Sequence, residues 1–436
     1  MPQFDTVIRS QRVVTQEGVV PAAVGIRSGR VTAVCSYDAP LCSDRETDLG
    51  TVALLPGGID LDVTVQPPGR PLREGYAATD TAALRGGVTT MVITPAPADP
   101  AITRLVALDT HATAAAKTTA HVVFLGGITA RSTPADLADL RAAGAAGFHC
   151  SLSGEGPGAF VDDTRLHKAM AEAAAMEVPL FVHAEDAREL VTPARAGNSA
   201  FLASRPPRAE RRGLERVVAA ARATGARTHV SPFTAAECAA VLAAARAIGV
   251  PITAHTCPHY LCLPAEHVPD DSPAHRCRPP LRSGANRDAL WRALLSTEDS
   301  AITTIGSGHR PGTGVAALPW TLPALWTAAA RRGRGLADLV RWTAAAPAEL
   351  IRLHAKGRIA SGYDADLVAF DTAAQQTVPA DDPGPYAGRS LNGRITRTWV
   401  GGRDAFPPEE GSYALSERRE IPIHAGDGRP GAQQWG

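Results

Sequence analysis

Histidine and aspartate side chains stand at the ends of several short apolar segments of this sequence. His183, His229 and His255 lie in VPLFVHAE, ARTHVSP and VPITAHT, and Asp62 lies in PGGIDLDVTV. Three imidazoles and one water form an open catalytic zinc site, and an imidazole is also a general base near neutral pH without metal. The sequence therefore offers metal-assisted or direct acid–base chemistry, provided that the fold brings these side chains together.

The elements that must position these residues are strands and helices in alternation. From residue 56 onward, short apolar runs such as TTMVIT and AHVVFLGG alternate with alanine-rich stretches such as TAAECAAVLAAARAIG. Alternation sustained over roughly 300 residues is typical of parallel strands joined by crossover helices, and a (β/α)8 TIM-type barrel fits this length. Barrel enzymes keep their chemistry at the carboxyl ends of the strands.

Both ends of the chain have a different pattern. FDTVIRSQRVV and VGIRSGRVTAV alternate apolar and polar residues as half-buried antiparallel strands do, and strand-like segments return in ADLVAFD and GRITRTWVGGRDAF. We therefore expect an α/β chain in which residues 1–55 and 358–404 form a small β-sandwich domain and residues 56–357 form the barrel. Residues 405–436 are polar and rich in Gly and Pro, as a surface tail is.

Composition narrows the class of partner. The formal net charge is zero, so the sequence has no electrostatic footprint for nucleic acid or an anionic membrane. The first residues lack a signal-peptide pattern, and no apolar run reaches the ~18 residues of a membrane span. The seven cysteines show no disulfide or zinc-thiolate spacing. We expect a cytoplasmic protein with a small-molecule substrate and neither nucleic-acid nor membrane partners.

Nine segments, in order along the chain, resemble the amidohydrolase superfamily in its dihydroorotase, allantoinase and hydantoinase branch. They are LLPGGIDLDV, TAALRGGVTTMVITP, GAAGFHCSLSG, VPLFVHAED, ASRPPRAE, THVSPFTAAE, HTCPHYLCL, RPPLR and KGRIASGYDADLVAFD. The resemblance covers residues 54–371. It implies the barrel with a β-domain from the chain ends, and a homo-oligomer, either a dimer or a tetramer.

The resemblance also implies a site. Such enzymes open or close cyclic amides with two divalent metals, which a carboxylated lysine bridges, while an aspartate after the last strand ligates metal and moves the proton. The six ligand slots (a histidine pair, the lysine, two histidines and the aspartate) correspond in chain order to Asp62, Thr64, His149, His183, His229 and Gly308. Four of the six slots have therefore changed.

The lysine content excludes the standard two-metal centre. The only lysines are Lys117 and Lys168, both in helix-like stretches, and Lys356, in the KG segment near the end of the barrel. No carboxylated lysine can bridge two metals here. Two alternatives remain open: one zinc ion held by His149, His183 and His229, or no metal, with His183 and His229 packed and hydrogen-bonded in an emptied pocket.

Other positions carry the expected proton transfer and substrate contacts. Asp62 or His309 would take the proton-transfer role that Gly308 leaves vacant, and His255 replaces a usually acidic residue and would line the pocket. Gln66 stands where dihydroorotases hold a carboxylate with arginine, and Arg278 replaces their asparagine before PPLR. A dihydroorotase-like substrate is therefore not expected, although Arg278 could bind a carboxylate from another direction or be structural.

Two functions follow as hypotheses. In the first, the chain is a diverged enzyme that makes or breaks a C–N bond in a cyclic amide, imide or ureide. In the second, it is a catalytically inactive homologue kept as a structural or regulatory subunit. The change to titratable groups at Asp62, His149 and His255 favours a repurposed site, because decay alone would leave small or apolar residues, as at Thr64 and Gly308.

Overall fold

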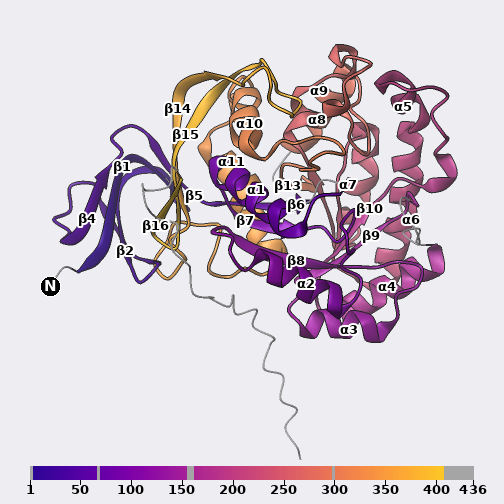
Figure 1. The fold of residues 1–436 in the computed structure, drawn as a ribbon, viewed down its shortest axis with the longest axis horizontal. Coiled ribbons are helices and arrows are strands. Elements are labelled where there is room, and N and C mark those ends of the chain that lie inside the picture. Colours follow the sequence, from indigo (N-terminus) through magenta and orange to yellow (C-terminus); the bar gives the residue numbers. More distant parts are fainter. Residues whose placement is uncertain (1–2, 66–68, 155–161, 297–299, 407–436) are drawn as a thin grey trace, which may run out of the picture.

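The computed structural model describes residues 3–65, 69–154, 162–296 and 300–406. Two sheets organise this part of the chain, and they lie beside each other in Figure 1. The first is an eight-stranded parallel barrel surrounded by helices. The second is built from both ends of the chain, so the fold class expected from the sequence is confirmed.

The barrel strands follow one another in chain order, and each pairs in parallel with the next. They are β6 (Gly58–Val63), β7 (Val88–Ile93), β8 (His121–Gly127), β9 (Gly147–Ser151), β10 (Leu180–His183), β11 (Thr228–Val230), β12 (Ile252–Thr256) and β13 (Ile302–Ile305). A bridge between Val63 and His309 joins the first strand to the segment after the last. Two backbone hydrogen bonds hold this joint, from the Thr64 amide to the His309 carbonyl (2.9 Å) and from the His309 amide to the Asp62 carbonyl (3.1 Å).

Helices cover the outside of the barrel. They are α1 (Leu72–Arg85), α2 (Leu105–Ala115), α3 (Pro134–Ala142), α4 (Asp163–Ala175), α5 (Asn198–Ser204), α6 (Pro207–Thr224), α7 (Ala239–Ala247), α8 (Pro258–Cys262), α9 (Gly284–Leu295), α10 (Thr321–Ala330), α11 (Leu336–Val340) and α12 (Ala346–Leu350). Local signals set several ends: Thr133 and Asp136 form a capping box at α3, and Gly225 ends α6 in the left-handed conformation. Every residue of β7 is buried, as expected of parallel strands with both faces covered.

The second sheet combines β1 (Phe4–Thr15), β2 (Gly18–Arg27), β3 (Arg30–Ser36), β4 (Ser43–Asp48), β5 (Ala53–Pro56), β14 (Leu367–Thr377), β15 (Ser390–Val400) and β16 (Arg403–Phe406). Its order is β16-β15-β14-β5-β1-β2-β3, with β4 also paired to β1. The antiparallel pairing of β1, β2 and β3 agrees with their alternating sequence. The exact division of the chain at residues 55 and 357 stays a prediction, and residues 407–436 of the expected tail lie outside the described residues.

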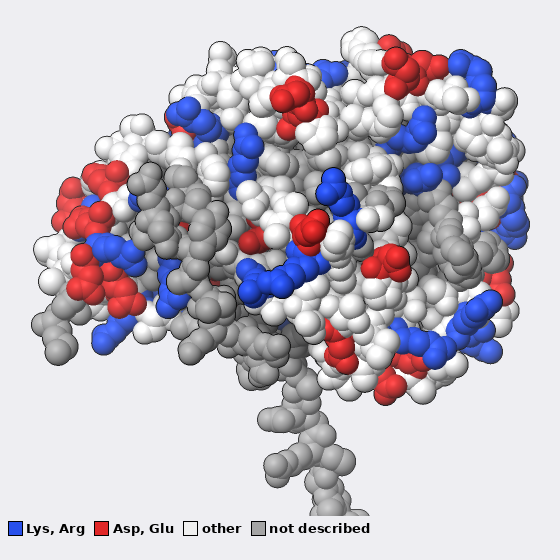
Figure 2. All heavy atoms as spheres, viewed as in Figure 1, with Lys and Arg blue, Asp and Glu red and all other residues white. Residues whose placement is uncertain are grey.

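Two apolar cores fix the barrel. The larger lies between strands and helices, and a smaller one inside the barrel includes Ile59, Val92, Leu125 and Phe181. Within the described ranges, no helix is both long and apolar enough to cross a bilayer. On the face of the molecule in Figure 2, basic and acidic side chains are interspersed.

Candidate functional site

Strand alternation directs four histidines to the inside of the barrel. Their neighbours in sequence belong to the large outer core: Phe148, Val182, Val230 and Ala254. Adjacent residues of a strand point to opposite faces, so the histidine beside each of these core residues faces inward. These inward residues are His149, His183, His229 and His255. The sequence expectation that they share one interior therefore agrees with the strand geometry.

Asp62 and Arg310 form an ion pair where the barrel closes. A guanidinium Nη2 of Arg310 donates to Asp62 Oδ1, and Nη1 donates to the backbone carbonyls of His309 (3.0 Å) and Asp62 (3.4 Å). Burial alone would raise the pKa of Asp62, but Arg310, His255 and His149 together hold it below its ordinary value. Asp62 is therefore a buried carboxylate that stays ionised at neutral pH.

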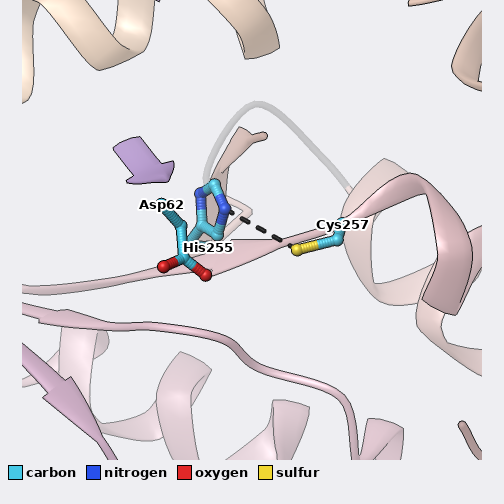
Figure 3. A group of neighbouring side chains, drawn as sticks. All are labelled: Asp62, His255 and Cys257. Atoms are coloured by element: carbon cyan, nitrogen blue, oxygen red, sulfur yellow. Dashed lines mark hydrogen bonds between the residues drawn. The ribbon is translucent and has the colours of Figure 1, made fainter. Parts of the chain in front are cut away.

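Asp62 also lies beside His255 and Cys257, which come from the end of β12 (Figure 3). One ligand atom from each of these three buried residues lies within 4.8 Å of the others, and His255 Nε2 is 3.9 Å from Cys257 Sγ. Burial and the nearby carboxylates raise the thiol pKa of Cys257 well above its ordinary value, and burial lowers the pKa of His255 to about 4. Thiol and imidazole are thus both neutral at pH 7.

One hydroxyl group joins two of the histidines. Thr304 Oγ1 lies 2.9 Å from His255 Nδ1 and 3.0 Å from His229 Nε2, so it donates to one ring and accepts from the other. The remaining nitrogen of His229, Nδ1, lies 2.7 Å from Thr253 Oγ1. His229 is fully buried, and burial holds its pKa well below the ordinary value. Both of its ring nitrogens are occupied by threonine hydroxyls.

His183 belongs to a second cluster of charged side chains, which it forms with Glu185 and Arg205. Its Nε2 lies 2.8 Å from Glu185 Oε2, and the same carboxylate accepts from Arg205 Nη2 at 2.6 Å. Glu185 has no exposed surface. Burial would raise the pKa of Glu185, but His183 and Arg205 lower it to about 2. Glu185 therefore orients His183 as a fixed, negatively charged partner.

The remaining inward histidines are also neutral. Burial lowers the pKa of His149 to about 4, although Asp62 opposes this shift, and burial lowers the pKa of His309 to about 3. His259, on α8, behaves similarly, with a pKa of about 3. The Nδ1 atoms of His259 and His309 are buried without a hydrogen-bond partner. The site thus combines His149, His255, His259 and His309 as neutral imidazoles with two ion pairs, Asp62–Arg310 and Glu185–Arg205.

Asp60 lies two residues before Asp62 on β6, and both side chains are buried. It accepts hydrogen bonds from the amides of Ser307 (2.8 Å) and Asp62 (3.1 Å). Burial raises the pKa of Asp60 to about 6, against the lowering effect of these hydrogen bonds. Asp60 therefore titrates closer to neutral pH than an ordinary aspartate.

The residues present do not fit a two-metal centre bridged by carboxylated lysine. Lys117 and Lys168 are exposed, and Lys356 is buried against Asp366 (2.5 Å) and Asp364 (3.0 Å), so each lysine is accounted for elsewhere. Among the described residues, Asp62, His255 and Cys257 form the one cluster with metal-ligand spacing. The predicted zinc set of His149, His183 and His229 stays a prediction. A zinc ion there would have to displace a threonine hydroxyl from His229, whereas Glu185 occupies only Nε2 of His183.

The predicted substrate contacts remain open. Arg278 is exposed, and its guanidinium lies 5.6 Å from the centre of the Phe201 ring. Gln66 lies outside the described residues. Its role as a substrate contact stays a prediction, as does that of Arg278.

Sequence reasoning missed four residues that complete the site: Cys257, Thr304, Glu185 and Arg310. Two of them had a readable signal. Cys257 follows His255 at the two-residue spacing that keeps side chains on one face of a strand. Arg310 stands where the family motif after the last strand, His-Ala-Pro, has alanine. The partners of Glu185 and Thr304 had no such signal, because they come from other strands or from a distant arginine.

Comparison with known proteins shows which family and which fold this chain shares. The model of the family described as "Amidohydrolase family" matches residues 53–404. An allantoinase of Streptomyces avermitilis is 39% identical over 430 residues, covering 92% of this chain and 95% of that protein. An allantoinase of Rubrobacter xylanophilus is 33% identical, with 95% and 96% covered. The structure of an L-hydantoinase from Arthrobacter aurescens superimposes with a TM-score of 0.83 at 24% identity, over 92% and 96% of the two chains, which shows the shared fold.

Proposed function

Because this chain belongs to the amidohydrolase family, we propose that it makes or breaks a C–N bond in a cyclic amide, imide or ureide, and that it does so without a two-metal centre. The named relatives support a hydrolase with a small-molecule substrate. Their names imply allantoin, a cyclic ureide, as substrate, so a ureide ring is the first candidate for this chain.

The Asp62–Arg310 pair carries the proposal. Burying a carboxylate and a guanidinium costs free energy that packed apolar residues would not cost, so such a pair inside a barrel is a marker of function. The pair lies at the carboxyl-end face, where barrel enzymes do their chemistry. Asp62 Oδ2 has no hydrogen-bond partner among the described residues and can accept a proton. His149 and His255, both neutral, flank this carboxylate.

The reaction in the opening direction consumes one water. The water oxygen adds to the ring carbonyl carbon, one of its protons passes to Asp62, and the C–N bond breaks as that proton moves to the leaving nitrogen. The products are a carboxylic acid and an N–H group on the same open chain. Ring closure is the reverse of these steps through the same transition state.

Turnover of a small panel of rings tests the proposal. We would incubate the full-length protein with allantoin, hydantoin, dihydrouracil and succinimide and follow ring opening by chromatography, in wild type, Asp62→Asn and Asp139→Asn. Asp139 is an exposed carboxylate on α3 and serves as the control. We expect Asp62→Asn to lose about 100-fold or more in kcat/KM on the accepted ring. No turnover of any ring, or equal rates for all three proteins, would refute the proposal.

One observation favours the second candidate, a catalytically inactive subunit. Both nitrogens of His229 are satisfied by Thr253 and Thr304, as in a structural histidine. An inactive subunit would leave all four rings intact but would raise the activity of a partner enzyme on mixing, with or without Asp62→Asn. The proposed dimer or tetramer is tested by sedimentation, and the proposed cytoplasmic location by fractionation of the host cells.

A further inference from the structure

We propose that the guanidinium of Arg310, held in place by Asp62, replaces the divalent cations that polarise the amide carbonyl in related enzymes. The inference rests on the proposed function, since it names the group that would activate the carbonyl. It goes further in assigning that role to Arg310, while Asp62, the proposed proton acceptor, also holds the guanidinium in place.

Arg310 is fixed in position. Its Nη2 donates to the Asp62 carboxylate, and its Nη1 donates to two carbonyls of the joint that closes the barrel, those of Asp62 and His309. A planar guanidinium with contacts to both a side chain and the backbone keeps one orientation. Arg310 is therefore a rigid cation and differs from a flexible surface arginine.

Arg310 is the arginine that the structure pairs with Asp62, at the joint that closes the barrel. A guanidinium stays protonated throughout the working pH range, so Arg310 is a permanent positive charge at this site. A fixed cation aimed at the reacting carbonyl is the main requirement of electrostatic catalysis.

Part of the guanidinium is available to a ligand. An arginine has five N–H donors. The hydrogen bonds of Arg310 to described residues come from Nη1 and one N–H of Nη2, which leaves Nε–H and the other Nη2–H. The side chain is 25% exposed. An N–H of this kind can donate to a carbonyl or ureide oxygen of a bound ring.

The same arrangement disfavours a metal ion. Asp62 is the one charged ligand of the cluster with His255 and Cys257, and Arg310 already neutralises it. A divalent cation placed there would also face the guanidinium at close range. Arg310 and a metal therefore compete for the same carboxylate.

The metal content of the purified protein shows, independently of activity, whether Arg310 or a metal ion occupies the Asp62 carboxylate. Full-length wild type, Arg310→Met and Arg334→Met would be stripped with chelator, loaded with Zn²⁺ or Co²⁺, desalted and analysed for metal. Arg334 is an exposed arginine and provides the control. We expect about 0.1 equivalent or less in wild type and the control, and a gain toward one equivalent in Arg310→Met, lost again when Cys257→Ser is added. Stoichiometric metal in stripped and reloaded wild type would overturn the inference.

Chemical rescue tests the catalytic role. On the ring accepted by wild type, we expect Arg310→Ala to lose about 10²–10³ in kcat and millimolar guanidinium chloride to restore at least a tenth of it. Chelator should leave wild-type kcat/KM unchanged. Loss of activity with chelator, or no rescue in a folded Arg310→Ala, would contradict the inference while the proposed ring opening stands.

Folding of these variants needs its own control. Arg310→Met and Arg310→Ala leave Asp62 buried without its cation, so the double variant Asp62→Asn/Arg310→Met, which removes both charges, would be measured beside them. If only the single Arg310 variants unfold, the double variant is compared with Asp62→Asn, and we expect it to lose about tenfold or more in kcat beyond that variant. A double variant as active as Asp62→Asn would refute the role of Arg310. Conversely, absence of turnover in wild type, with metal analysis as expected, would defeat the proposed function alone.

Discussion

A carbon atom added to Gly308 would lie 2.9 Å from the sulfur of Cys257. The same atom would lie 3.1 Å from Cε1 of His259, and Gly308 has a φ of +61°, in the left-handed region. Gly308 occupies the position that corresponds to the metal-ligating aspartate after the last strand in the amidohydrolase family. The slot is thus closed by neighbouring side chains and by backbone conformation, and restoring the aspartate would not simply restore the site.

We therefore predict that Gly308→Asp binds no additional metal and is destabilised. The expected loss is about 1–3 kcal/mol of unfolding free energy, from the left-handed backbone and the contact with Cys257. Urea denaturation measures the stability. Gly249→Ala is the matched control, since Gly249 has a φ of +82° with open space around its Cβ position. The steric contact is tested separately with alanine: Gly308→Ala should lose more unfolding free energy than Gly249→Ala. Equal losses in these two variants would show that the contact with Cys257 costs nothing.

The hydroxyl of Thr304 should contribute substantially to the free energy of unfolding, because it bonds two buried histidines. Thr304→Val keeps the shape but leaves one nitrogen of His229 and one of His255 without a partner, and each unsatisfied buried group costs about 1–3 kcal/mol. We expect a loss of at least ~2 kcal/mol in chemical denaturation. Thr303→Val, on the same strand but partly exposed, should change stability little. Similar stability for the two variants would mean that the bridge contributes nothing.

Glu185 should be essential to stability as well as to the orientation of His183. Glu185→Gln removes the buried carboxylate that pairs with both Arg205 and His183, and breaking a buried ion pair costs about 3–5 kcal/mol. Glu189→Gln is the control: Glu189 pairs with Arg208 and Arg212 near the surface, where such pairs contribute about 1 kcal/mol or less. Thermal unfolding separates these outcomes, and comparable melting temperatures would count against a buried pair.

Acid should destabilise the protein partly through His255. Its folded pKa of about 4 lies below the ~6.5 of an unfolded histidine, so between these values the unfolded chain binds the additional proton. Stability contributed by neutral His255 is complete above about pH 6.5 and falls as pH decreases toward 4. Between pH ~6.5 and pH ~5 the loss is about 2 kcal/mol. Asp60, with its pKa raised to about 6, acts in the opposite direction.

Comparing His255→Gln with wild type at both pH values isolates this contribution, because the other titrating groups are common to both proteins. We expect the variant to lose about 2 kcal/mol less on acidification. His354→Gln, at an exposed position, should follow wild type. A variant at 255 with the full acid sensitivity would mean that His255 is protonated in the folded chain.

The fold could be predicted from the sequence because its signals are local. The alternation of apolar runs with alanine-rich helices and nine motifs in family order specified the barrel, and β1 to β3 were readable from their two-residue period. The inward placement of His149, His183, His229 and His255 followed from strand alternation once the strands were known.

The contacts inside the site could not be predicted in the same way. Asp62 and Arg310 are separated by 248 positions and meet only because the barrel closes between them. Thr304 contacts two histidines from different strands, and nothing in its own neighbourhood marks it. Side-chain partners across a barrel depend on register and tilt, which short motifs do not record. The sequence therefore identified the groups in the site but not their pairing.

The joint between Val63 and His309 links ligand binding at Arg310 to the hydrogen bonds that close the barrel. The two amides that close the ring, of Thr64 and His309, donate to the backbone carbonyls of His309 and Asp62, which also accept from Arg310. A ligand that moves the guanidinium therefore changes the hydrogen bonding of the two carbonyls that close the barrel. Deuterium uptake at these two amides would therefore report ligand binding before any substrate has been identified.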